Sequence, residues 1–148
     1  MKKITIAIWQ ALILSLVLGA GVGQSLAQEE QILARGETHY LRYCAVCHGE
    51  TGKGGGLLAE YLKILPTDLT QLSKKHQGEF PFWQVYRIID GREEVKGHGT
   101  RNMPIWGEEL RISEPKAQPE FVEDLIAGRV WQMILYIRSL QEASAKTP

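Results

Sequence analysis

The two cysteines of this 148-residue chain lie three positions apart and are followed at once by a histidine, in the order Cys44-Ala45-Val46-Cys47-His48. This Cys-X-X-Cys-His order is the attachment pattern of a c-type haem. Each thiol adds to one vinyl group of the porphyrin, so that two thioethers fix one edge of the ring. When the segment is helical, the imidazole of His48 lies beneath the ring, where it can bind the iron. The pattern therefore predicts one covalent haem c, with Cys44 and Cys47 as thioether donors and His48 as the proximal ligand.

Three other interpretations of the two thiols are weaker. A thioredoxin-like dithiol needs a preceding strand in a βαβ unit, whereas the residues before Cys44 have a helical pattern. A structural zinc site needs a second pair of ligands at a recognisable spacing, and the sequence contains no further cysteine. A disulfide between the two cysteines leaves His48 without a role.

The charge balance gives no sign of a nucleic-acid partner. The chain has 17 basic and 17 acidic side chains, so its formal net charge is zero. Without Lys2 and Lys3, 15 basic side chains remain against 17 acidic ones. The sequence has no extended basic patch of the kind that binds nucleic acid. The length corresponds to one domain plus an export segment.

The first residues have the pattern of a secretory signal peptide. Two lysines precede an apolar run over residues 4–22, and a small-x-small cleavage pattern ends at Ala27. We therefore expect a signal peptide over residues 1–27 and a mature domain over residues 28–148, located in the periplasm or otherwise exported. The alternative is an uncleaved membrane anchor, because a run of about nineteen residues is close to the length that spans a bilayer.

Three stretches of the mature chain have the apolar periodicity of a helix. They are residues 28–43, residues 82–90, and a terminal stretch that begins at Pro119 or only at Gly128 and ends near Leu140. Gly36 lies on the apolar face of the first stretch, and a glycine inside a helix usually marks close approach by another element. Pro81 and Gly91 bracket the second stretch as start and stop signals. No stretch alternates as a strand does.

A glycine-rich segment over residues 49–56 follows His48. Its glycines and lysine do not have the order of a phosphate-binding loop, and no strand precedes it. The glycines are expected to let the backbone turn tightly beside the macrocycle. A short helical turn over residues 57–65, ended by Pro66, is expected next.

The mature chain resembles class I cytochromes c over nearly its whole length. Three segments in the family's order carry the resemblance: Gly36-X3-Tyr40-X3-Cys44-Ala45-Val46-Cys47-His48-Gly49, Asn102-Met103-Pro104-Ile105-Trp106-Gly107 and Ile134-Leu135-Tyr136-Ile137-Arg138-Ser139-Leu140. The resemblance implies a small all-α cytochrome c fold around one haem, with the first and last helices crossing where Gly36 meets the region of Tyr136. It also implies that the backbone oxygen of Pro66 supports the proximal imidazole.

The resemblance makes Met103 the expected distal iron ligand, since a thioether is a soft donor that favours ferrous iron. His98, flanked by glycines, is the main rival, and His76 and His39 are more distant ones. A vacant sixth position is the remaining alternative. Trp106 is expected to belong to the core; the alternative is that its indole N–H reaches a haem propionate.

These residues imply an exported one-electron carrier rather than an enzyme, with the iron cycling between the ferrous and ferric states. Its partners would be a redox donor and a redox acceptor that dock transiently, with membrane contact only if the N-terminal segment stays attached. Four lysines are candidates for guiding an acidic partner: Lys53, Lys63, Lys74 and Lys75. The alternatives are a dedicated haem subunit of a periplasmic dehydrogenase or reductase, and a haem enzyme with an open sixth position.

Overall fold

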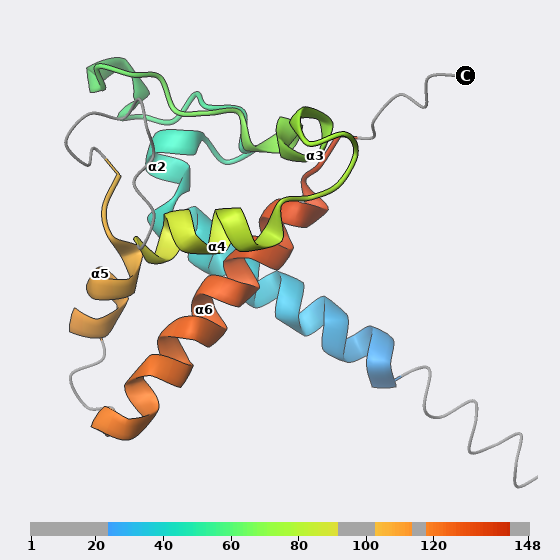
Figure 1. Ribbon diagram of the computed structural model, residues 1–148, viewed down its shortest axis with the longest axis vertical. Helices are drawn as coiled ribbons and strands as arrows, with labels where there is room; N and C mark the ends of the chain where they lie inside the picture. Colours follow the sequence, from blue (N-terminus) through green and yellow to red (C-terminus); the bar gives the residue numbers. More distant parts are fainter. Residues whose placement is uncertain (1–23, 92–102, 114–117, 143–148) are drawn as a thin grey trace, which may run out of the picture. The chain divides into compact units, whose positions relative to one another are not determined.

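The computed structural model describes residues 24–91, 103–113 and 118–142 (Figure 1). The chain divides into two compact units, Met1–Ile32 and Leu33–Pro148. Most of the predicted signal peptide and the loop that contains His98 lie outside the described residues. None of the helices in the described ranges is long and apolar enough to cross a membrane.

The regular elements of the described residues are all helical, which confirms the all-α class. A helix over residues 24–43, of which residues 33–43 belong to the larger unit, begins before the predicted start at residue 28. The elements that follow are α2 (Ala45–His48), the 3-10 helices η1 (Ala59–Tyr61) and η2 (Leu69–Gln71), α3 (Leu72–Lys75), α4 (Phe82–Asp90), α5 (Trp106–Ile112) and α6 (Pro119–Ser139). The bounds of α4 agree with the predicted stretch, and η1 lies inside the predicted helical turn.

The terminal helix α6 begins at Pro119, which resolves the two starts that the sequence left open. Proline is well suited to the first turn of a helix, where its missing N–H would have no partner. The helix then continues through Gly128 without a break. A mid-helix glycine costs about 1 kcal/mol relative to alanine. Burial of the apolar face outweighs this cost, because Val130, Met133 and Ile134 are fully buried.

Helix α5 was not predicted from the sequence. Its seven residues make fewer than two helical turns, which is too short for apolar periodicity to be recognised. Glu108 and Glu109 lie in its first turn, where their negative charges stabilise the helix by interacting with the positive end of its dipole. Leu110 is the residue that α5 buries completely.

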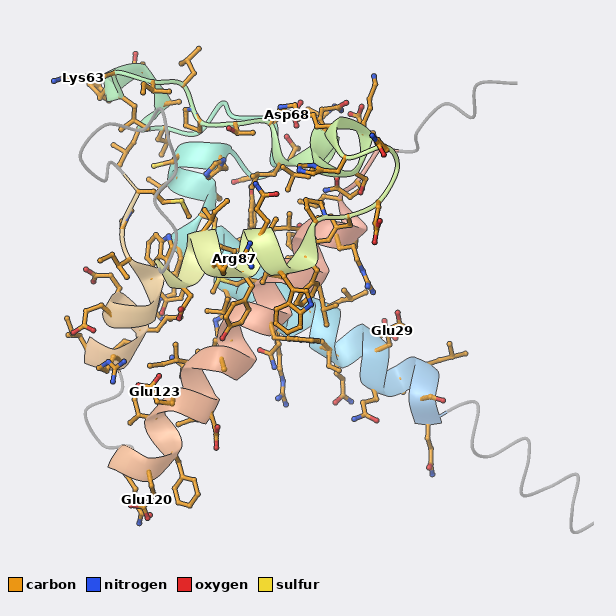
Figure 2. The ribbon with its side chains drawn as sticks, in the orientation of Figure 1. Glu29, Lys63, Asp68, Arg87, Glu120 and Glu123 are labelled. Atoms are coloured by element: carbon orange, nitrogen blue, oxygen red, sulfur yellow. The ribbon has the colours of Figure 1, made fainter. Side chains whose placement is uncertain are left out.

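Helices α4, α5 and α6 pack against one another and form most of the core, as Figure 1 shows. The buried core residues are Tyr40, Cys44, Val85, Ile89, Leu110, Ile126, Val130, Met133, Ile134 and Ile137. At the outer edge of this packing, Arg111 of α5 forms an ion pair of 2.6 Å with Glu123 of α6, which is labelled in Figure 2. The core therefore includes Cys44, the first residue of the predicted attachment pattern.

The N-terminal helix crosses α6 at Gly36, as the resemblance implied. A Cβ placed on Gly36 would meet the carbonyl oxygen of Gln132 and would lie 3.0 Å from Cβ of Tyr136. Next to this crossing, the rings of Tyr40 and Tyr136 pack with their centroids 5.3 Å apart. Glycine is therefore required at this position because the two backbones approach closely.

Gly36→Ala is expected to lower the free energy of unfolding by about 1–3 kcal/mol, the usual cost of overpacking, because its methyl group must displace the backbone of α6. Gly128→Ala is the matched control, since a Cβ at Gly128 has no atom within 4 Å. The control should raise the free energy of unfolding by about 0.5–1 kcal/mol through helix propensity alone. Urea unfolding followed by far-UV circular dichroism measures both. A stabilised Gly36→Ala variant would contradict the close crossing.

Candidate functional site

Helix α2 holds the Cys-X-X-Cys-His segment in helical geometry. The amide of Cys44 donates to the carbonyl oxygen of Tyr40 at 2.8 Å, and the amide of His48 donates to that of Cys44 at 2.9 Å. Both thiols are free of a disulfide; Cys44 is buried and Cys47 is half-buried. The helical condition that the sequence analysis set for placing the imidazole of His48 is therefore met.

One cavity brings together all four predicted site residues. It contains about 500 Å³ of empty space, part of which is open solvent. Its lining residues are Tyr43, Cys44, Cys47, His48, Leu62, Ile64, Pro66, Met103, Pro104 and Trp106. Two thiols, an imidazole and a thioether thus face one largely apolar space, although Met103 is more than fifty residues from His48 in sequence.

The wall that carries Met103 is attached to the N-terminal helix by an aromatic contact. The rings of Trp106 and Tyr43 lie with their centroids 5.4 Å apart. Met103, Trp106 and Tyr43 are all partly buried against the core. Trp106, expected in the core, is partly buried against the core rather than one of its buried members, and it also forms part of the cavity wall. The start of α5 is fixed by this contact, which keeps Met103 at the cavity.

The imidazole of His48 is oriented by the carbonyl oxygen of Thr67. Its Nδ1 lies 3.0 Å from that oxygen. Because a carbonyl oxygen can only accept a hydrogen bond, Nδ1 is the donor in this contact, and in the neutral form of the ring the lone pair is on Nε2. The predicted acceptor, Pro66, is thus wrong by one residue. Pro66 is buried and lines the cavity instead.

The segment around Thr67 is held by hydrogen bonds on both sides. Asp68 accepts from the amide of Thr70 at 2.9 Å and from its hydroxyl at 2.6 Å, and these hydrogen bonds lower the pKa of the Asp68 carboxyl. The amide of Leu69 donates to the carbonyl oxygen of Gly52 at 2.7 Å. The side chain of Gln141 donates to the carbonyl oxygen of Leu69, also at 2.7 Å. These contacts fix the carbonyl that orients the imidazole.

The turn after His48 is fixed by a buried phenol and by a close backbone approach. The hydroxyl of Tyr40 donates to the carbonyl oxygen of Gly49 at 2.7 Å, and burial raises the pKa of this phenol. Further along, a Cβ on Gly56 would meet the carbonyl oxygens of Ala45 and Val46. The glycines thus let the backbone pass directly over the carbonyl end of α2.

The chain matches no protein-family model, no curated protein and no solved structure. Assignment of a function therefore depends on the residues of the site itself.

The dithiol alternative is disfavoured by the surroundings of Cys44. A thiol–disulfide enzyme uses a thiolate with a lowered pKa. Here burial, and then the neighbouring Cys47, raise the pKa of Cys44 to about 12. The residues that precede Cys44 are helical rather than a strand. Within the described ranges, no three His, Cys, Asp or Glu side chains gather into a group able to hold a metal ion on their own.

Two of the rival histidines do not line the cavity. His39 stacks on Tyr43 with ring centroids 6.3 Å apart, and burial lowers its pKa. His76 has its Nδ1 2.9 Å from the carbonyl oxygen of Leu72, at the end of α3. Met103 is thus the candidate distal ligand that the described residues place at the cavity.

Proposed function

We propose that this protein is an exported monohaem c-type cytochrome that carries single electrons between redox proteins. The observation that carries the proposal is the cavity shared by the Cys-X-X-Cys-His segment and Met103. In this proposal Cys44 and Cys47 hold the haem c through thioethers, His48 is the proximal ligand and Met103 is the distal ligand.

The residues of the cavity fit this group. Four donor side chains of the types that hold a c-type haem line it, and the rest of the lining is mainly apolar. The buried thiol of Cys44 and the half-buried thiol of Cys47 are one helical turn apart, so both can reach one edge of a planar ring.

The hydrogen bond from His48 to Thr67 suits a metal ligand. A ligating histidine generally donates its other ring N–H to a carbonyl or carboxylate, which fixes the tautomer and increases the basicity of the ligating nitrogen. The Nδ1–H of His48 has such an acceptor, so Nε2 is the nitrogen that would bind iron. When bound, the haem supplies an iron centre that changes reversibly between the ferrous and ferric states.

The two candidate iron ligands and the apolar lining of the cavity favour electron transfer over catalysis. If His48 and Met103 both bound the iron of a haem held here, they would leave no coordination position for a substrate. Leu62, Ile64 and Trp106 would give a haem in this cavity mainly apolar contacts, and an apolar setting favours electron transfer without substrate chemistry. The expected location is the periplasm or another exported compartment, because covalent haem attachment is a modification made outside the cytoplasm.

The test is expression of the full chain in a host that exports it and attaches c-type haem. We expect the mass of the purified mature protein to exceed that of its polypeptide by one haem, and the pyridine haemochrome spectrum to be that of a haem with two thioethers. The oxidised protein should be low-spin and show the long-wavelength band of iron–methionine ligation. Absence of covalent haem would contradict the proposal. A high-spin spectrum would indicate the open-site enzyme, and stable co-purification with a larger enzyme would indicate a dedicated subunit.

A further inference from the structure

We propose that the open groove beside α2 is the surface on which the redox partner docks, and that this partner presents an apolar patch bordered by basic side chains. This inference rests on the proposed function, because the groove adjoins the segment where the haem would be attached. The groove, with about 1230 Å³ of empty space including open solvent, is lined by Leu41, Ala45, Val46, Gly49, Glu50, Gly55, Gly56, Leu57, Ala59 and Glu60.

The groove exposes aliphatic side chains that nothing in the described residues covers. Leu57 is 84% exposed, Leu41 is 45% exposed and Val46 is 39% exposed. Leu58, beside Leu57, is 45% exposed. Single exposed aliphatic residues are ordinary on a protein surface, whereas several gathered in one concave region are typical of an interaction site.

The groove adjoins the helix that carries the proposed attachment site, although it shares no lining residue with the site cavity. Val46 lies between the two cysteines, and its carbonyl oxygen accepts from the amide of Leu58 at 2.9 Å. The amide of Gly56 donates to the carbonyl oxygen of Cys47 at 3.1 Å. A partner in the groove would therefore contact the backbone that carries the thioethers. Because electron transfer slows steeply with distance, this contact offers a short path to the partner.

The charged residues of the groove are both acidic. Glu50 and Glu60 line it, both are exposed, and neither forms an ion pair within the described part of the chain. A surface with two uncompensated carboxylates and no lining cation gives a negative local potential, which favours a partner with basic side chains at the matching positions.

The cations nearest to the groove in sequence do not line it. Lys53 forms an ion pair of 2.9 Å with Glu142, and the guanidinium of Arg42 lies over the ring of Tyr43 at 5.3 Å. Figure 2 shows Lys63 at the outer end of the segment over residues 57–65, pointing outward, and it does not line the groove. The candidate lysines named from the sequence would attract an acidic partner, whereas this groove is expected to attract a basic one.

Two small redox reagents of opposite charge test the proposal on the haem-loaded mature protein. Tris(phenanthroline)cobalt(III) is an apolar cation that takes one electron from the ferrous protein and becomes cobalt(II). Ferricyanide is a polar anion that takes one electron and becomes ferrocyanide. Stopped-flow absorbance gives the second-order rate constant for each reagent as a function of ionic strength.

We expect Glu50→Gln/Glu60→Gln to slow oxidation by the cobalt complex about three- to tenfold at low salt, because attraction of the cation to the groove is lost. The same variant should react with ferricyanide at least as fast as the unmodified protein. Leu57→Ser should slow the cobalt complex about threefold or more through loss of apolar contact. Glu79→Gln and Ile112→Ser, which alter exposed residues outside the groove, are the controls and should leave both rate constants unchanged.

The outcomes separate this inference from the proposed function. If neither reagent oxidises the protein, the electron-carrier proposal fails. If both reagents oxidise it at rates that the groove variants do not change, the docking surface alone is wrong. Sedimentation velocity adds one further outcome: a dimer that Leu57→Ser dissociates would overturn the inference, because a second copy of the chain would then cover the groove.

Discussion

Replacing Met103 with alanine is expected to lower the reduction potential by a few tenths of a volt, within the roughly 0.8 V that axial ligands span. The thioether stabilises ferrous iron, and its loss leaves a site that water or hydroxide can fill. The variant should also bind cyanide or carbon monoxide readily, because the sixth position becomes accessible. Spectroelectrochemical titration and ligand binding followed by absorbance measure the two effects.

Two variants distinguish the candidate ligands. Met103→His should restore six-coordination at a lower potential than the unmodified protein, since imidazole lacks the preference of the thioether for ferrous iron. His98 lies outside the described residues. His98→Ala should leave the spectrum nearly unchanged. If His98→Ala abolished the low-spin spectrum and Met103→Ala preserved it, the distal ligand would be His98 and the high-potential carrier would be excluded.

Replacing both cysteines, in Cys44→Ala/Cys47→Ala, is expected to abolish covalent haem attachment and most of the folded structure. The cavity lies beside the core, so in the proposed cytochrome its apolar lining residues would lose the packing that the ring supplies. Loss of packing contacts around a cavity destabilises a protein. A mature domain of this size has only about 5–15 kcal/mol of stability to lose.

Far-UV circular dichroism and mass spectrometry of the exported chain measure the loss of structure and of haem. Each single variant, Cys44→Ala or Cys47→Ala, is an informative intermediate, because it can keep one thioether and should shift the pyridine haemochrome spectrum. A double variant that retained a covalent haem spectrum would contradict the proposed attachment site. A cooperative, native-like thermal transition without haem would contradict its role in the core.

The sequence predicted the elements whose signals are local and strong. Pro81 and Gly91 marked the ends of α4 correctly, and the apolar face of α6 is buried where periodicity placed it. Gly36 predicted a close approach, and the N-terminal helix does cross α6 there. The four candidate site residues, recognised from their order along the chain, face one cavity.

The parts that were missed depend on tertiary contacts. Helix α5 is too short for periodicity, and the contact of Trp106 with Tyr43 helps to hold its first turn. The acceptor for His48 was placed one residue early because Pro66 was chosen by resemblance to a family proline, and a resemblance in sequence does not fix which backbone carbonyl faces the imidazole. The acidic groove beside α2 unites residues from the N-terminal helix and from the segment over residues 49–60, which no single pattern connects.

The hydrogen bonds of Gln141 tie the residues that follow α6 to the segment beside His48. They join its side chain to Leu69 and Ser73 across 72 and 68 residues of sequence. Closing loops of such length costs entropy, so these bonds depend on the rest of the fold being in place. In the proposed cytochrome, a change just after α6 would therefore reach the carbonyl oxygen of Thr67 and, through it, the orientation of the imidazole of His48.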